Sequence, residues 1–387
     1  MKYETAAQMA ERLGVTVRIV QLWAGSGKLP GAIKHGRDWL IPAGLEKPGK
    51  AAAPETELKN IPLPLVNSSF NIGTAADFVT LFDCEDTARL ARTEYLYFTG
   101  NFQEAVELSE AFYNNENIVI KLTACLVYAF SNIAVGNTHL AELSLGCIEE
   151  SVKKELSKES TDALRAYCIL IASTAAILMH EECDLELEEH VRYLPEGLKL
   201  WALYVISHKL YVAGNNAKAL GVVQTALLLS DKAYPLAEIY LHLSAAMNYM
   251  ALKDIESGRR HFLKAWETAL PDGFFEPFGE HHGLLCGLIE ACLKSEYYAE
   301  YKGIIGIANK FSKGWRTIHN DRMKKTVTHN LATTEFVISM LASRGWSNQE
   351  IADYMNMSLH NVKRYISIVY QKLDITSRGQ LKQYMLK

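Results

Sequence analysis

The chain lacks the sequence features that mark secreted and membrane-spanning proteins. Its first residues contain no apolar segment of the kind found in signal peptides, and its most hydrophobic long stretch, residues 167–179, is too short to cross a bilayer. The seven cysteines include no C-x-x-C pair, which argues against a disulfide framework and favours reduced thiols. We therefore expect a cytoplasmic protein with no membrane partner.

Residue patterns that carry out catalysis or bind metals are also missing. The Gly-rich run ending in Lys28 is followed by Leu29 where a phosphate-binding loop has Ser or Thr, and it lacks that loop's earlier glycine. The run beginning at His180 has no second histidine at zinc-protease spacing, and residues 280–282 (Glu-His-His) have only Cys286 nearby. We therefore expect no enzymatic activity, no cofactor and no metal, and interpret these histidines as core or solvated side chains.

Proline and glycine are scarce, and the distribution of proline divides the chain. The 10 prolines and 24 glycines, with 49% hydrophobic residues, exclude a disordered or fibrous protein. Six of the prolines fall within the first 64 residues, and the next is Pro195. This clustering predicts an extended linker near the N-terminus, and a polar stretch after residue 312 predicts a second one. The predicted division is a head at 1–48, a linker at 49–68, a helical body at 69–312, a linker at 313–328 and a C-terminal domain at 329–387.

The net charge of −4 conceals an uneven distribution. Residues 1–48 hold 7 Lys or Arg against 4 Asp or Glu, and residues 313–387 hold 12 against 5. The ends thus carry +3 and +7, which leaves −14 for the segment between them. Basic ends around an acidic body are typical of a protein that binds nucleic acid at both ends.

The body has a weak internal repeat of helix, turn and helix. Apolar residues recur at helical spacing from about residue 72 to 311, and turn residues interrupt this pattern at Gly100, Gly136, Gly214, Lys253 and Ser295. The spacing predicts one further copy near residue 175. Small residues follow four of the turns by five positions, where two paired helices would approach closely: Ala105, Ala141, Ala219 and Gly258.

This pattern resembles the tetratricopeptide repeat (TPR), a helical hairpin that stacks into a superhelix with a concave groove. The resemblance implies that the groove holds a small-molecule or peptide effector, and an irregular all-α bundle is the alternative fold. Six tyrosines are candidates for lining the groove, although aromatic residues at helical spacing more often belong to the core: Tyr95, Tyr97, Tyr128, Tyr204, Tyr240 and Tyr249.

The C-terminal domain contains a helix-turn-helix pattern. Ser347 is the expected N-cap of a short helix, with Glu350 at the capping-box position, and Ser358 is the expected N-cap of a second helix that runs to about residue 373. One stripe of the second helix is apolar and should pack on the first: Val362, Ile366, Val369 and Leu373. Its opposite face is polar and basic: His360, Arg364, Ser367 and Gln371, flanked by Asn361 and Lys363. This arrangement is typical of a helix that enters the major groove of DNA.

This domain resembles the DNA-binding domain of LuxR-type transcription regulators, which has four helices. The matching features are Leu331 and Glu335, the run at 347–352, the pairs Val362-Lys363 and Lys372-Leu373, and Ser377-Arg378. The resemblance implies that Asn361, Val362, Lys363 and Tyr365 lie at the groove and that Asn348 and Lys372 contact phosphate. Ser358, His360 and Arg364, at the start and on the polar face of the second helix, are further expected DNA contacts. The resemblance also implies a dimer contact through Thr376, Arg378 and Leu381. A helical hairpin that only caps the repeat stack is the alternative.

The head contains a second helix-turn-helix pattern, followed by a β-hairpin. Thr5 and Thr16 are the expected N-caps of two helices separated at Gly14, and two β-forming pieces at 32–34 and 39–41 flank a turn that contains glycine. This head resembles the winged helix-turn-helix of MerR-like regulators and phage excisionases. The resemblance implies DNA contacts at Thr16, Arg18, Gln21, Lys28, Lys34 and Arg37. A head that binds protein instead of DNA is the alternative.

The predicted fold is mainly α: a TPR-like superhelix flanked by an N-terminal winged helix-turn-helix with a small β-wing and a C-terminal four-helix LuxR-type domain. The first functional hypothesis is a bacterial, cytoplasmic transcription regulator that binds promoter DNA as a homodimer. An effector at the body would control it, and it would contact RNA polymerase. The second hypothesis is a TPR-like scaffold for a protein partner, in which DNA binding is secondary or lost.

Overall fold

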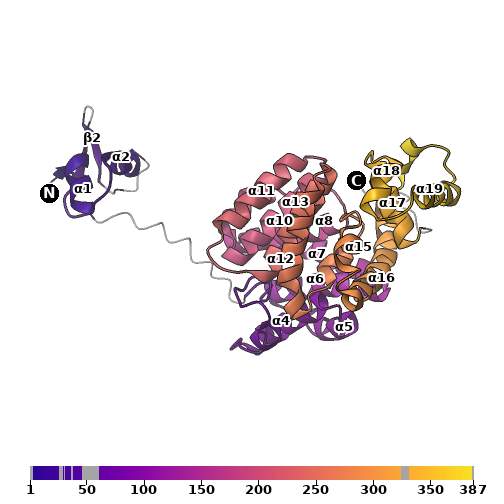
Figure 1. Ribbon diagram of the computed structural model, residues 1–387. Helices are drawn as coiled ribbons and strands as arrows, with labels where there is room; N and C mark the ends of the chain where they lie inside the picture. Colours follow the sequence, from indigo (N-terminus) through magenta and orange to yellow (C-terminus); the bar gives the residue numbers. More distant parts are fainter. Residues whose placement is uncertain are drawn as a thin grey trace. The chain divides into compact units, whose positions relative to one another are not determined.

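The computed structural model describes residues 3–25, 29, 31–35, 38–45, 61–323 and 331–385. This part of the chain contains 19 α-helices and three short strands, so the predicted mainly helical fold is confirmed. The chain forms two compact units, Met1–Glu57 and Leu58–Lys387, which are described separately (Figure 1).

The smaller unit consists of two helices and a three-stranded sheet. Its elements are β1 (Tyr3–Thr5), α1 (Ala6–Leu13), α2 (Val17–Gly25), β2 (Ile33–His35) and β3 (Asp38–Pro42). The strand order is β1-β3-β2, and both pairs are antiparallel. Strands β2 and β3 coincide with the two β-forming pieces of the sequence. The sequence did not predict β1, because three residues are too few for an alternating pattern.

The packing of this unit follows from its local sequence. Met9, Val20 and Ile41 are fully buried and join the two helices to the sheet. The Thr5 side chain accepts a hydrogen bond from the backbone N–H of Gln8, which closes a capping box at the start of α1. Helix α1 ends at Gly14, whose φ of 63° lies in the left-handed region that glycine adopts without strain.

The larger unit is an array of helices. Its main elements before the C-terminal domain are α3 (Ala75–Phe78), α4 (Glu85–Phe98), α5 (Phe102–Glu110), α6 (Ile118–Val135), α7 (Thr138–Leu156), α8 (Asp162–Leu178), α9 (Leu187–His190), α10 (Glu196–Val212), α11 (Asn216–Leu229), α12 (Pro235–Ala251), α13 (Ile255–Ala269), α14 (Glu276–Glu280), α15 (Leu288–Leu293) and α16 (Tyr298–Met323). Three short 3₁₀ helices are η1 (Val191–Tyr193), η2 (Leu270–Asp272) and, near the C-terminus, η3 (Arg378–Gln383). The C-terminal domain has α17 (Thr333–Ser343), α18 (Asn348–Tyr354) and α19 (Leu359–Leu373).

Each of the five turns marked in the sequence lies between two successive helices of the body. The first four adopt a left-handed conformation, with φ of 83° at Gly100, 91° at Gly136, 77° at Gly214 and 63° at Lys253. The copy expected near residue 175 is degenerate: α8 continues through that position, and the short helix α9 stands where a full partner helix was expected.

Small residues in the second helix of the first four hairpins allow the two helices to approach closely. Ala105, Ala141 and Ala219 are fully buried. A Cβ added at Gly258 would lie 3.2 Å from the Met250 side chain. The hairpin interpretation therefore accounts for these four positions.

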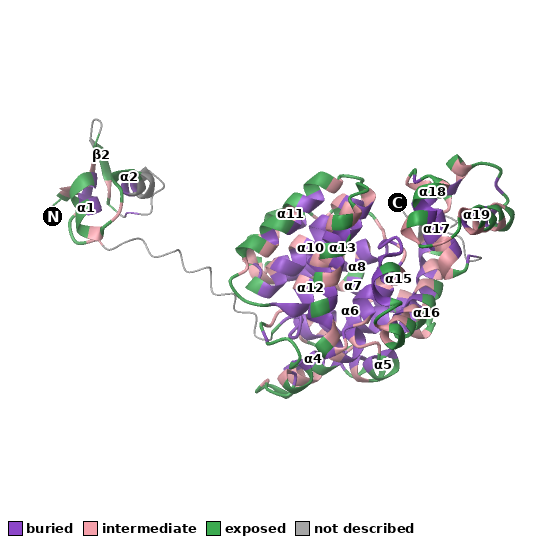
Figure 2. Cartoon of the chain, in the orientation of Figure 1, coloured by how far each residue is buried: buried purple, intermediate pink, exposed green. Residues whose placement is uncertain are grey.

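The body closes on itself, which an open superhelix does not do. Helix α16 contacts α6 and α7, and α14 contacts α4 and α12, although these helices are far apart in the sequence. In an open solenoid each repeat contacts only its neighbours. The interior is continuous and buried (Figure 2), and four of the six tyrosines expected near the groove lie in it: Tyr97, Tyr128, Tyr204 and Tyr240.

Both predicted linkers extend less far than expected. Residues 62–66 are buried, and the backbone N–H of Val66 donates to the Glu94 carboxyl at 3.0 Å. Proline predicts an extended chain there, but the intervening Leu63 and Leu65 place that chain in the core. In the second linker, residues up to 323 continue α16, because Trp315 and Ile318 give this polar segment a buried apolar face.

One described helix is long and apolar enough to cross a membrane. It is α6, with a mean hydropathy of 1.9 over 18 residues. Because 83% of α6 is buried inside the larger unit, it has the burial of a core helix.

We predict that Gly314→Ala destabilises the larger unit. A Cβ at this position of α16 would overlap the carbonyl oxygen of Ile133 in α6, so the helices must move apart. The expected loss is about 1–3 kcal/mol of unfolding free energy, measured by urea denaturation. The matched control is Gly306→Ala on the same helix, where an added Cβ meets nothing within 4 Å and stability should stay equal or rise.

We predict that Glu94→Gln changes how stability depends on pH. Burial raises the pKa of Glu94 to about 8 from its ordinary 4.5. At a pH between these two pKa values, the carboxyl is ionised in the unfolded chain and protonated in the folded chain. The carboxyl therefore lowers the free energy of unfolding as pH rises, by about 1.4 kcal/mol per pH unit. The stability of the variant relative to wild type should therefore increase from pH 5 to pH 8, whereas the exposed Glu104→Gln should show no such trend.

Candidate nucleic-acid interface

The C-terminal domain is built around the apolar stripe of α19. Val362, Ile366, Val369 and Leu373 are all buried, as are Ile351 and Ala352 on the preceding helix. Helices α17 and α18 both contact α19. The predicted packing of the two helices is confirmed.

Local sequence fixes where the two helices begin. The Ser347 hydroxyl accepts the backbone N–H of Glu350 at 3.2 Å, and Glu350 closes the capping box at α18. The Ser358 hydroxyl accepts the backbone N–H of Asn361 at 3.2 Å at the start of α19. Asn356 adopts a φ of 50° in the turn between them. These caps fix the residues at which α18 and α19 begin.

The opposite face of α19 is exposed and polar. Its exposed residues are His360, Lys363, Arg364, Ser367 and Gln371. Neither Lys363 nor Arg364 takes part in an ion pair within the described residues, and the Arg364 guanidinium lies 5.4 Å from the centre of the Tyr365 ring. A helix with this face can enter a major groove, where Lys and Arg contact phosphate oxygens and guanine edges.

Three residues expected at the DNA are partly or fully buried in the domain. Val362 is fully buried in the apolar stripe and therefore does not reach a base edge. Tyr365 and Asn361 are half-buried, with Tyr365 packed against the core. The resemblance placed Val362 at the groove because it adjoins Lys363, but adjacent helical residues point in directions about 100° apart.

Two other expected DNA contacts are engaged in bonds within the domain. The Lys372 ammonium donates to both carboxyl oxygens of buried Glu335, at 2.7 and 3.0 Å. The Asn348 side chain accepts from Arg378 at 2.7 Å. Their first role is to hold α17, α18 and α19 together.

The expected dimer residues also differ in environment. Thr376 is exposed, whereas Leu381 is fully buried in the domain core. Arg378 donates to the carbonyls of Ala342 and Trp346 in addition to Asn348, so it joins three segments. The fourth helix is the 3₁₀ helix η3, which turns Leu381 inward. Thr376 is thus the one of these three whose side chain faces solvent.

Residues 329–385 match the family model described as bacterial regulatory proteins, luxR family. The match identifies a luxR-type helix-turn-helix domain. It supports a DNA-binding transcription regulator. No curated protein and no solved structure gave a significant match to the chain.

The luxR-type domain is docked on the body through its side away from the α19 polar face. Arg344, which follows α17, donates to the Cys286 sulfur and the Tyr211 hydroxyl. Lys253 donates to the carbonyl of Gly345 at 3.1 Å and lies 3.8 Å from the Glu350 carboxylate. Sequence patterns did not reveal these contacts, because the repeat pattern marks Lys253 only as a turn residue and no motif gives the partners of Arg344 or Lys253.

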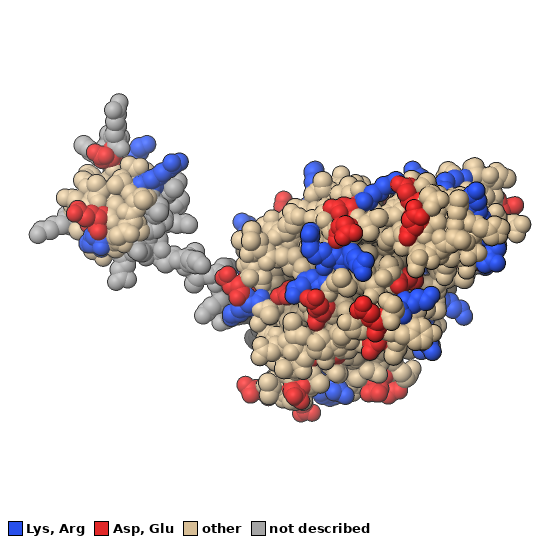
Figure 3. Space-filling model, viewed as in Figure 1, with Lys and Arg blue, Asp and Glu red and all other residues tan. Residues whose placement is uncertain are grey.

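Charge on the visible face of the larger unit is mixed. Lys and Arg side chains there alternate with Asp and Glu over the body (Figure 3). This face has no continuous basic field to attract DNA. Lys363 and Arg364 on the exposed face of α19 can supply positive charge to a duplex there.

The smaller unit exposes four of its six expected DNA contacts. Thr16, Arg18, Gln21 and Lys34 are all exposed, the first three at or within α2. Lys28 and Arg37 lie outside the described residues. The exposed positions on one helix and one strand are compatible with the expected winged arrangement.

The Glu-His-His segment at 280–282 belongs to the core. His281 and His282 are 1% and 6% exposed, and His282 lies 2.9 Å from the Glu290 carboxylate. Within the described residues no cluster of metal-binding side chains occurs.

We predict that Arg378→Lys destabilises the luxR-type domain. Lysine has no planar fork and cannot keep three bonds to Ala342, Trp346 and Asn348. Leaving a half-buried carbonyl unpaired costs about 1–3 kcal/mol. Urea denaturation of the full chain should show this loss, while the exposed neighbour Lys382→Ala should unfold like wild type; equal stability of all three proteins would contradict the assigned role.

Proposed function

We propose that this protein is a sequence-specific transcription regulator that reads promoter DNA with α19. The observation that carries the proposal is the exposed face of α19, where Lys363 and Arg364 form no ion pair with any described residue. His360, Ser367 and Gln371 lie on the same face. In this role Lys363 and Arg364 bind phosphates or guanine, and the polar side chains select bases. Val362 supports the helix from beneath.

Control by an effector at the body is part of the proposal. The contacts of Arg344 and Lys253 join the luxR-type domain directly to the body. A ligand that binds one arrangement of this junction more tightly than another shifts the population that is competent for DNA. The body thereby acts as the sensing part of the molecule.

The smaller unit serves as a second DNA-binding module in this proposal. Arg18 and Gln21 on α2 contact bases or phosphates, and Lys34 on the β-hairpin contacts phosphate. Two modules on one chain raise overall affinity when the linker spans their sites. Homodimer formation through the exposed Thr376 surface and contact with RNA polymerase complete the regulator hypothesis.

We predict that Lys363→Ala/Arg364→Ala strongly weakens selective DNA binding. DNA sites are first selected from a random library with the full chain, and affinity is then measured at 50 and 200 mM salt. The variant should lose at least tenfold in affinity, and its salt dependence should become shallower by about one unit of logarithmic slope per lost phosphate contact.

The matched control is Lys153→Ala/Lys154→Ala, which removes the same charge from the exposed side of α7. It should bind the selected DNA as wild type does. Equal losses in both variants would mean that overall charge, and not α19, governs binding. Failure of the wild-type chain to select any sequence would favour the scaffold hypothesis.

A further inference from the structure

A cavity lies where the luxR-type domain meets the body. Its volume is about 90 Å³, whereas a single water needs roughly 10–15 Å³ by the same measure. The body contributes residues of α10, α14 and α16, and the luxR-type domain contributes Leu331, Thr333 and Phe336. The aromatic side chains of Phe311 and Trp315 form part of the cavity wall. A small molecule in this cavity therefore touches both parts.

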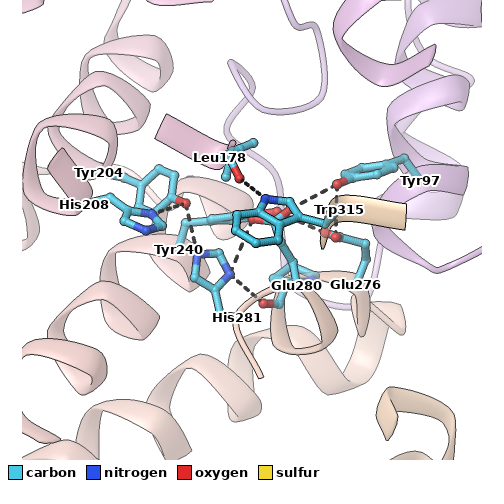
Figure 4. A network of polar contacts seen from close by, with 10 residues as sticks. Tyr97, Leu178, Tyr204, His208, Tyr240, Glu276, Glu280, His281 and Trp315 are labelled. Carbon is cyan, nitrogen blue, oxygen red and sulfur yellow. Dashed lines mark hydrogen bonds and ion pairs between the residues drawn. The ribbon is translucent and has the colours of Figure 1, made fainter. Parts of the chain in front are cut away.

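A chain of buried hydrogen bonds runs to this cavity from α14 (Figure 4). His281 Nδ1 lies 2.8 Å from the carbonyl oxygen of Pro277, which can only accept, so Nδ1 carries the proton. Burial lowers the pKa of His281 to about 4, so the ring is neutral and its Nε2 is an acceptor. The Tyr204 hydroxyl, 3.0 Å away, therefore donates to His281 Nε2.

This order fixes the tautomer of His208. The Tyr204 oxygen lies 3.1 Å from His208 Nδ1 and, having given its own proton to His281, accepts the proton of Nδ1. Burial holds the pKa of His208 well below its usual range, so the ring carries one proton only. His208 Nε2 is left as a lone pair without a hydrogen-bond partner, on a side chain that lines the cavity and is 1% exposed.

A second acceptor without a hydrogen-bond partner belongs to Glu280. The Tyr97 hydroxyl bridges Glu280 Oε2, at 3.1 Å, and Glu276 Oε1, at 3.0 Å, while Tyr240 donates to Glu276 Oε2 at 3.0 Å. Glu280 Oε1 accepts no hydrogen bond of good geometry: its nearest donor is His281 Nδ1, 3.5 Å away, whose proton points to the Pro277 carbonyl. The Glu280 side chain is 5% exposed and lines the cavity. Buried polar atoms are nearly always paired, so both unpaired acceptors require a donor.

We propose that this cavity binds a small ligand with a protonated amino group, which donates to Glu280 Oε1 and His208 Nε2. An ammonium group has three donors and no acceptor, which matches two unpaired acceptors. Burial raises the pKa of Glu276 and Glu280, and a cation beside this carboxyl pair favours its ionised form. The aromatic rings of the wall also attract cations. Arg316 also lines the cavity, but its Nε and Nη2 donate to Ser312.

Binding is tested by calorimetry on the full chain with ethylamine, ethanolamine and 1,3-diaminopropane. The matched probes are ethanol, ethylene glycol and acetate. At least one amine should bind ten times more tightly than every matched probe, and Glu280→Gln and His208→Phe should each weaken it at least tenfold. Glu104→Gln and His242→Phe, which lie outside the cavity, should bind as wild type does.

A second measurement needs no variant. In wild-type protein labelled with ¹⁵N-histidine, the resonance of His208 Nε2 should move when the amine is added, because its lone pair accepts a hydrogen bond. Absence of amine binding together with an unmoved resonance would overturn the proposal. Equally tight binding of the alcohols or of acetate would overturn the assignment of an amine.

An effect of amine binding on DNA affinity rests on the proposed function, and it is measured separately. With the selected DNA, saturating amine should change the affinity at least fivefold in wild type and leave Glu280→Gln unaffected. If the amine binds but the DNA affinity does not change, the amine does not control DNA binding. The proposed ligand site would still be supported. Loss of DNA binding in the α19 variant reports on the regulator function alone.

Discussion

The larger unit depends on the close packing of α16 across the body. Gly314 lets α16 approach the carbonyl of Ile133, and Trp315 donates from its indole to the carbonyl of Leu178 at 2.7 Å. At its C-terminal end, Arg322 pairs with Glu181 and Glu149. One helix of 26 residues thereby joins the first hairpins to the last ones and carries the luxR-type domain after it.

This packing explains why the sequence predicted the elements better than their assembly. Hairpins at Gly100, Gly136 and Gly214 follow from local turn chemistry, which a single sequence displays. The closure of the array depends on contacts between residues more than a hundred positions apart, such as Trp315 with Leu178 and Asp272 with the backbone N–H of Ala75. No periodic pattern records such pairs. The same reason hid the cavity, which needs α10, α14, α16 and α17 together.

The C-terminal domain was the most predictable part because its signals are local. The caps at Ser347 and Ser358 and the stripe from Val362 to Leu373 each lie within about four helical turns. The finer roles of residues depended on three-dimensional context. Lys372 and Arg378 look like cations for DNA or a partner, yet their nearest acceptors are Glu335 and the carbonyls of the same domain. The sequence shows that a side chain is charged, but only the structure shows which acceptor lies closest to it.

The contact between Arg344 and Cys286 has a consequence for the chemistry of the thiol. Cys286 is fully buried, burial raises its pKa, and the luxR-type domain covers it. An alkylating reagent can reach this sulfur only when the domain separates from the body, whereas Cys84 is exposed in either case. The rate at which Cys286 is alkylated therefore reports how often the luxR-type domain separates from the body. Cys84 is the reference thiol in the same molecule.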